Sequence, residues 1–316
     1  MFTAMESIEL AAHAKINLYL EVCGRRANGY HELRSVVVPV SLHDTIVLEP
    51  ADEIESVFDA VEVPVGGCGC LPASEHNLTT RAACALKAAT GYPGGVRIHI
   101  SKRIPIGGGL GGGSADAAAV LRGLMELWGV TMPLHEVMAL GSTLGCDIPA
   151  LLHGGAVVME GLGERVTPLE LGQPDTPDGR WWLVIVNPGF CVPTNDMYQR
   201  HDLALTSERP TYINAVSALK GGDLVSASQS LFNSLQTTVV RKYPLIGMII
   251  DQLEQVGALG AMVSGSGASV FGLARDESHA EAMAAKVKQS LDGSVWTRVV
   301  TLLPDGVMAA HGPLTP

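Results

Sequence analysis

The feature that most constrains this chain is a run of six glycines within the seven positions from Gly107 to Gly113. The run lies between an apolar segment that ends at Pro105 and an alanine-rich segment that begins at Ser114. Each ordered glycine costs about 0.5–1 kcal/mol relative to alanine, because the unfolded chain loses more conformational freedom. Six glycines together therefore need a purpose that offsets this cost.

A loop of this kind is suited to binding phosphate. Glycines let backbone N–H groups converge on one point, and a following helix adds its free N–H groups and the positive end of its dipole. The next residues, "SADAAAVL", keep large side chains away, and Asp116 in the expected first turn suits the dipole. The alternative is a flexible linker, but linkers are rich in serine and other polar residues. We therefore predict that residues 107–113, the glycine loop, bind phosphate.

Three known phosphate-binding patterns do not fit this loop. It contains the letters of the dinucleotide fingerprint, yet Pro105 separates strand from turn and no acidic residue follows about 20 positions later. A P-loop requires lysine and then serine or threonine, where this chain has Ser114 and Ala115. The lysine and catalytic-loop motifs of protein kinases are missing from the sequence.

Length and charge narrow the class of protein. A chain of 316 residues with 47% hydrophobic residues can fill two cores, and the segment "GQPDTPDGR" is the clearest break in composition. We expect two domains, residues 1–172 and 173–316. The formal net charge of −11 argues against nucleic acid as a partner. An anionic small molecule would have to be held by backbone dipoles and a few local cations.

The sequence predicts a cytoplasmic protein. The first ten residues contain two glutamates and no basic stretch before an apolar run, so we expect no signal peptide. No apolar run is long enough to span a membrane. Six cysteines are too few for a disulfide framework, so we expect reduced thiols. Cys68 and Cys70 lack a second pair at metal-ligand spacing, which favours an ordinary loop over a metal site.

Local patterns predict an α+β protein. Apolar, β-branched segments predict strands at residues 16–22, 33–42, 45–50, 96–100, 181–188, 268–275 and 295–303. Periodicity and end signals predict helices at residues 76–90, 114–128, 133–144, 245–257 and 278–291. Asn77 is the expected cap of the first helix and Gly91 its stop.

Three motifs, in this order, resemble those of the GHMP kinase family. They are "AKINLYL" (residues 14–20), "PIGGGLGGGSADAAA" (residues 105–119) and "MVSGSGASVFGL" (residues 262–273). The resemblance implies the two-domain, α+β GHMP kinase fold, with the active site in the cleft between the domains. It also implies ATP as the phosphoryl donor, together with Mg²⁺.

The resemblance assigns the nucleotide to the second motif. The expected contacts are Pro105, Gly107, Gly108, Gly109, Leu110, Gly111, Gly112, Gly113 and Ser114. Mg²⁺ often keeps several waters and binds largely through substrate phosphates, so its protein ligands stay unassigned, with Ser114 as one candidate.

The resemblance also implies a catalytic pair, Lys15 and Asp147. The carboxylate would accept or orient the proton of the substrate hydroxyl, and the ammonium would hold that carboxylate and stabilise charge on the phosphoryl group. From the residues alone, Lys15 would be an edge residue facing solvent, and Asp147 would as readily cap a turn before Pro149. Asn17 shares a strand face with Lys15 and would contact the substrate.

Four further stretches resemble the family members that act on a cytidine diphosphate substrate. They are residues 24–46, 100–105, 144–164 and 187–198. The resemblance implies that cytosine stacks between Tyr30 and Tyr198, and that His31 and Lys102 read its edge or the neighbouring groups. Thr194 is the remaining expected substrate contact.

Two other functions remain open at this point. One is a GHMP kinase for homoserine, mevalonate or a sugar, which differs in whether Tyr30, His31 and Tyr198 face the cleft. The other is a sensor that binds ATP without transfer, and the presence of Lys15 and Asp147 argues against it. We expect a monomer or a weak homodimer.

Overall fold

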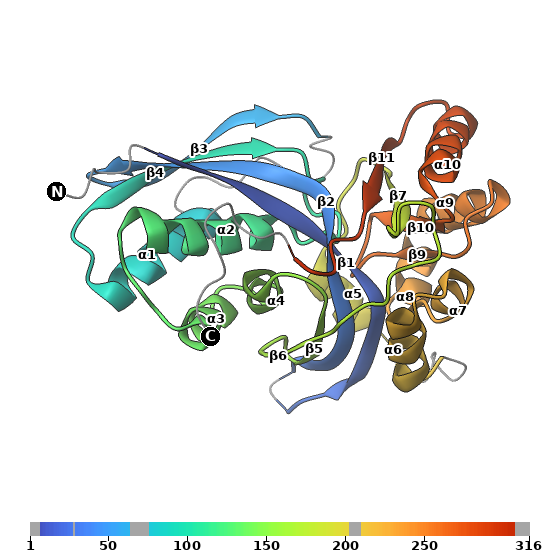
Figure 1. The fold of residues 1–316 in the computed structure, drawn as a ribbon, viewed down its shortest axis with the longest axis horizontal. Helices are drawn as coiled ribbons and strands as arrows, with labels where there is room; N and C mark the ends of the chain where they lie inside the picture. Colours follow the sequence, from blue (N-terminus) through green and yellow to red (C-terminus); the bar gives the residue numbers. More distant parts are fainter. Residues whose placement is uncertain (1–6, 28, 64–75, 202–209, 307–316) are drawn as a thin grey trace.

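The computed structural model describes residues 7–27, 29–63, 76–201 and 210–306, so Cys68 and Cys70 lie outside the described residues. Within them the fold is α+β, with two sheets (Figure 1). The seven-stranded sheet runs β3-β4-β2-β1-β8, with β5 paired to β2 and β6 to β5. Its strands are β1 (Ile8–Arg25), β2 (His31–Ala51), β3 (Ile54–Val61), β4 (Gly95–Lys102), β5 (Val157–Gly161), β6 (Arg165–Pro168) and β8 (Phe232–Asn233).

The second sheet is antiparallel and belongs to the C-terminal half of the chain. Its four strands lie in the order β11-β7-β10-β9. They are β7 (Trp182–Asn187), β9 (Ala261–Val263), β10 (Val270–Ala274) and β11 (Trp296–Thr301). The strands predicted at 181–188, 268–275 and 295–303 are therefore confirmed, while the three-residue β9 was not predicted.

The ten helices described are unevenly divided between the halves. The first half has α1 (Leu78–Thr90), α2 (Gly112–Leu127), α3 (Leu134–Ser142) and α4 (Ile148–His153). The second half has α5 (Thr194–Arg200), α6 (Tyr212–Gly221), α7 (Leu224–Gln229), α8 (Gln236–Lys242), α9 (Pro244–Gln255) and α10 (Glu277–Ser290). The five predicted helices correspond to α1, α2, α3, α9 and α10.

The two long strands β1 and β2 pair along most of their length in the middle of the larger sheet (Figure 1). The two strands predicted at 33–42 and 45–50 are one continuous strand, β2, because the polar residues between them still pair with β1, as His43 does with His13. The register shifts between His13 and Lys15 and again between Asn17 and Tyr19. Such irregularities re-aim side chains, and here they flank Lys15 and Asn17.

Helices α1 and α2 pack beside this sheet and form a core with β2 and β4. The alanines of α2 allow a close approach. At Gly123, an added Cβ would lie 2.3 Å from Leu10 Cδ1 and 2.6 Å from Leu48 Cδ1, so alanine there would have to displace the ends of these two side chains. The C-terminal part of α2 therefore packs closely against β1 and β2.

The predicted ends of these helices are partly confirmed. Asn77 caps α1 by accepting a hydrogen bond from the Thr79 N–H at 3.1 Å, and Gly91 ends it at φ +70°, as expected. Helix α2 begins two residues before Ser114, at Gly112, with Gly111 as its cap at φ +68°. Asp116 is therefore not in the first turn, and the expected role beside the dipole is wrong.

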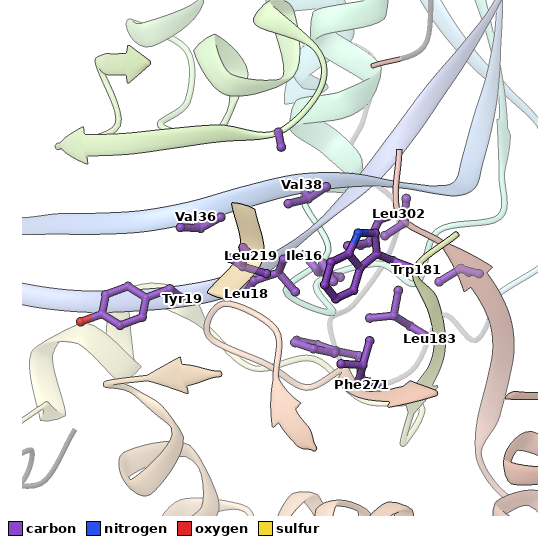
Figure 2. Close-up of a cluster of buried hydrophobic side chains, with 14 of the residues drawn as sticks. Ile16, Leu18, Tyr19, Val36, Val38, Trp181, Leu183, Leu219, Phe271 and Leu302 are labelled. Carbon is purple, nitrogen blue, oxygen red and sulfur yellow. The ribbon is translucent and has the colours of Figure 1, made fainter. Parts of the chain in front are cut away.

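One hydrophobic cluster joins the two halves of the chain. Figure 2 shows Trp181, Leu183 and Phe271 packed toward Ile16 and Leu18 of β1. The predicted domain boundary between residues 172 and 173 falls between β6 and β7, and it stays a prediction.

Cysteine chemistry differs in part from the expectation. Cys23, Cys84 and Cys146 have reduced thiols, as expected. Cys191 is disulfide-bonded, so the prediction of reduced thiols is wrong for this residue. No helix in the described part of the chain is long and apolar enough to cross a lipid bilayer.

Candidate active site

A single cavity of about 990 Å³ contains the predicted site residues. All of them line it, although they come from distant parts of the sequence: Lys15, Asn17, Tyr30, His31, Lys102, Pro105, residues 107–114, Asp147, Thr194 and Tyr198. Gly265 and Ser266 of the third motif line it as well. The fold thus brings the three motifs together around one space, while the role of each residue stays a prediction.

The glycine loop is fixed by hydrogen bonds from both halves of the chain. The Lys15 N–H of β1 donates to the Leu110 carbonyl at 2.9 Å. From the third motif, the Ser269 N–H donates to the Gly108 carbonyl at 3.0 Å and the Ser264 hydroxyl to the Gly109 carbonyl at 3.0 Å. These bonds occupy loop carbonyls, which leaves the N–H groups at the start of α2 available to an anion.

Two glycines show what the loop conformation requires. Gly109 has φ +77°, and a Cβ there would lie 2.2 Å from the Ser264 carbonyl oxygen, so packing alone demands glycine. Gly113 is different, because no described atom outside its own helix lies within 4 Å of the position of its missing Cβ. Gly113 is exposed and lines the cavity, so nothing described obstructs a phosphate group that approaches the start of α2 there. This open approach supports the predicted phosphate site.

The predicted catalytic pair is formed. Lys15 Nζ lies 3.3 Å from Asp147 Oδ2, and the exposed fractions of the two side chains are 5% and 27%. Lys15 is not an edge residue facing solvent, because its side chain is buried and its N–H donates to the Leu110 carbonyl. Asp147 occupies the cap position before α4, yet its side chain makes no capping hydrogen bond. Its carboxylate therefore serves the ion pair rather than the turn.

Asn17 is hydrogen-bonded within the protein. Its Oδ1 accepts from Lys15 Nζ at 2.8 Å, and its Nδ2 donates to Ser35 Oγ at 2.8 Å. Both bonds are buried. A contact between Asn17 and the substrate stays a prediction, and the bond to Lys15 is a function that sequence reasoning missed.

An aromatic group lines another part of the cavity. The rings of His31 and Tyr198 have centroids 5.6 Å apart and are tilted by 33°. Tyr30 is 62% exposed, and all three line the cavity. Burial raises the pKa of the Tyr198 phenol, which therefore stays protonated.

Thr194, the first residue of α5, shares a hydrogen bond of 2.9 Å with the hydroxyl of Ser266.

Lys102, at the end of β4, lines the cavity and is buried. Its ammonium is 2.7 Å from Asp116 Oδ2 and also contacts Asp44 Oδ2, and all three residues are buried. A Cβ at Gly112 would lie 3.4 Å from Lys102 Nζ, so this ammonium lies beneath the start of α2. Reading of the cytosine by Lys102 stays a prediction, and the ammonium is already paired with two carboxylates.

Of the two carboxyl groups beside Lys102, Asp116 is the one that more readily holds a proton. The Asp44 carboxylate also accepts hydrogen bonds from the backbone N–H groups of Arg103 and Ile104, whereas Asp116 Oδ1 has no partner among the described residues. Burial raises the pKa of Asp116 to about 7, against the opposing effect of Lys102.

The described residues contain no group of three histidine, cysteine or acidic side chains arranged to hold a metal. Near the start of α2, the side chains of Ser114 and Asp116 line the cavity. This arrangement fits a cation that is carried mainly by phosphate oxygens.

Several residues that hold the site together were not predicted. Asn233 donates to the carbonyls of Val263 and Gly265 at 2.8 and 2.7 Å, and Asn187 donates to Ser269 Oγ at 2.9 Å. These bonds shape the third motif against the glycine loop. The motif itself was visible in the sequence, but its partners depend on long-range pairing.

Two family profiles match the chain. The profile described as GHMP kinases N terminal domain matches residues 77–155, and that described as GHMP kinases C terminal matches residues 215–293. Curated relatives named 4-diphosphocytidyl-2-C-methyl-D-erythritol kinase include those of Symbiobacterium thermophilum and Rhodospirillum rubrum. The first is 41% identical, covering 85% of this chain and 91% of the relative. The second is 37% identical, covering 96% of each.

Solved kinase structures are also similar to this chain. A crystal structure of 4-(cytidine 5'-diphospho)-2C-methyl-D-erythritol kinase is similar with a TM-score of 0.75 and 34% identity, covering 93% of this chain and 99% of that one. A homoserine kinase from Cytophaga hutchinsonii has a TM-score of 0.71 but only 19% identity, covering 95% of this chain and 96% of that one. The second likeness concerns the fold alone.

Proposed function

The chain belongs to the GHMP kinase family, and from this premise we propose that it phosphorylates the 2-hydroxyl of 4-diphosphocytidyl-2-C-methyl-D-erythritol. ATP is the phosphoryl donor, and the products are the 2-phosphate and ADP. The carrying observation is the Lys15–Asp147 pair, which faces the same cavity as the glycine loop. The reaction is a step of the non-mevalonate route to isoprenoid precursors, as the relatives' shared name implies.

We assign a part of the reaction to each residue of the pair. Asp147 accepts the proton of the substrate hydroxyl as its oxygen bonds to the γ-phosphorus, and the bond from that phosphorus to ADP breaks. Lys15 holds the carboxylate and stabilises the charge on the transferred oxygens. Mg²⁺, when bound with ATP, would supply further neutralisation, with Ser114 as a candidate ligand.

The choice of substrate rests on the aromatic group. Tyr30, His31 and Tyr198 all line the cavity, which supports a cytidine substrate over homoserine, mevalonate or a sugar. Stacking on an aromatic ring contributes about 1–3 kcal/mol per base but tolerates any base, so hydrogen bonds must select cytosine.

The same proposal covers the cellular setting. We place the enzyme in the cytoplasm, as a monomer or weak homodimer that acts on small molecules and not on nucleic acid. The formal net charge of −11 supports the last point, because a polyanion would be repelled.

The test is a panel assay. The purified protein is mixed with ATP, Mg²⁺ and, separately, the cytidine substrate, homoserine, mevalonate and galactose, and ADP release is followed. We expect ADP only with the cytidine substrate, and mass spectrometry should find one added phosphoryl group on it. Lys15→Met is the control for contaminating kinases. Turnover with another alcohol, or with none, would exclude the proposed reaction.

A further inference from the structure

Ser35 is a buried hydroxyl that the proposed reaction does not use. It lies in β2, opposite Leu20 of β1, and its exposed fraction is 0%. Its hydroxyl donates to the Tyr19 carbonyl at 2.7 Å, and its oxygen accepts from Asn17 Nδ2 at 2.8 Å. Ser35 therefore contacts the residue that contacts Lys15. From this chain of bonds we propose that Ser35 is a positioning residue for Lys15 and acts by fixing the direction of the Asn17 amide.

The single proton of the Ser35 hydroxyl decides which way the Asn17 side-chain amide points. A serine hydroxyl has one proton, and that of Ser35 is used on the Tyr19 carbonyl, so Ser35 can only accept from Asn17. The Asn17 amide must then point its NH₂ group at Ser35, which leaves its oxygen for the Lys15 ammonium. The reversed amide would set its NH₂ group against the ammonium and lose both hydrogen bonds.

Burial makes this constraint strong. Lys15, Asn17 and Ser35 have exposed fractions of 4%, 2% and 0%, so water cannot replace a lost partner without entering the protein. The third motif closes the other side, because a Cβ at Gly265 would lie 3.4 Å from Asn17 Oδ1 and 3.5 Å from Lys15 Nζ. The amide is therefore confined between two strands and a loop.

We expect the orientation of the Asn17 amide to affect phosphoryl transfer rather than ATP binding. Lys15 Nζ is held between Asn17 Oδ1 and Asp147 Oδ2, and a small displacement weakens the stabilisation of the transferred phosphoryl group. The glycine loop has its own supports from Ser264 and Ser269, which do not involve Ser35. This inference rests on the proposed phosphoryl transfer.

The first experiment compares three variants of β2. We expect Ser35→Ala to lower kcat by about tenfold, the effect of one positioned hydrogen bond, with KM for ATP within about twofold. Ser35→Thr keeps a hydroxyl and should restore most of kcat. Ser41→Ala is the matched control, because Ser41 accepts a bond from the Thr301 N–H outside the cavity. Its kcat should equal that of the wild type even if its Tm falls.

A double-mutant cycle tests whether Ser35 acts through Asn17. In an Asn17→Ala background, the further change Ser35→Ala should lower kcat by less than about twofold, because the amide that it orients is gone. A full tenfold loss in that background would overturn the proposal, as would normal kcat in a folded Ser35→Ala protein.

A readout without turnover separates this proposal from the proposed function. The ¹H–¹⁵N signal of the Lys15 ammonium, assigned by its loss in Lys15→Met, should shift in Ser35→Ala and stay in place in Ser41→Ala. An unchanged signal in Ser35→Ala overturns the positioning role. Failure of the wild type to phosphorylate any alcohol would instead remove the proposed function and leave this spectroscopic test decisive.

Discussion

At the scale of single residues, Asp147 is the group whose replacement should change the reaction most directly. Asparagine keeps its size but cannot accept a proton or pair with the Lys15 ammonium, which lies 3.3 Å away. We expect Asp147→Asn to lower kcat by about 10²–10⁴-fold. ATP affinity should persist, because the glycine loop is held by other residues. Near wild-type turnover in a folded variant would mean that another group takes the proton.

Gly113 gives a selective test of the phosphate site. Alanine at Gly111 would strain a φ of +68° and contact Lys15 Cγ at 2.9 Å, so its effect would mix folding with binding. Gly113 has neither problem, because no described atom outside its helix lies near the position of its missing Cβ, and the residue lines the cavity. We expect Gly113→Ala to weaken ATP binding at least about tenfold, because the methyl group obstructs the phosphates.

The control for this prediction is Gly221→Ala. Gly221 is also helical, has open space around its missing Cβ and lies outside the cavity. Both variants should keep or raise Tm, since alanine favours helix by about 1 kcal/mol over glycine. Calorimetric titration measures ATP affinity in each. Equal affinity in the two variants would place the phosphates elsewhere.

At the scale of elements, Asp116 of α2 and Lys102 of β4 connect the two ends of the glycine loop through a buried contact of 2.7 Å between the Lys102 ammonium and Asp116 Oδ2. The pKa of Asp116 is raised to about 7 by burial, so the folded protein holds this proton at pH values where the unfolded chain has released it. Stability must therefore fall as the pH rises from about 4 to about 7, and change no further above that range on this account.

Asp116→Asn removes this titration. The Tm of the variant minus that of the wild type should grow between pH 5 and pH 8, as the wild type takes on a buried charge that the variant lacks. Thermal unfolding of both proteins in matched buffers measures this difference. The exposed Asp251→Asn serves as the control and should give a constant difference. A constant difference for Asp116→Asn too would contradict the raised pKa.

How far the elements could be predicted depended on their length. Helix α1 shows local signals at both ends, and its bounds were predicted within two residues. Helices α4 and α7 have six residues each, too few for a periodic pattern to stand out. Strands β8 and β9 have two and three residues and exist only because neighbours pair with them. Such elements are determined by tertiary structure.

Some features of the candidate site could likewise be predicted from the local sequence, and others could not. The glycine loop could be interpreted as a phosphate site from local chemistry, and the Lys15–Asp147 pair followed from the motif resemblance. The bonds of Ser35 to Asn17 and of Lys102 to Asp44 could not be predicted, because they depend on the register of β1 with β2 and of β2 with β4. A register shift of one residue would point these side chains to the opposite face.

At the scale of the whole molecule, the shared cluster in Figure 2 predicts that the two halves unfold together. Leu183 of β7 is fully buried among residues of β1 and β2, and Leu124 of α2 is fully buried in the other large cluster of the first half. Truncation of either leucine to alanine should lower the free energy of unfolding by about 2–5 kcal/mol.

If the shared core makes the protein one cooperative unit, calorimetry of the wild type gives a single transition. Leu183→Ala and Leu124→Ala should each lower that whole transition. Two independent domains would instead give two transitions, and each variant would lower only one of them.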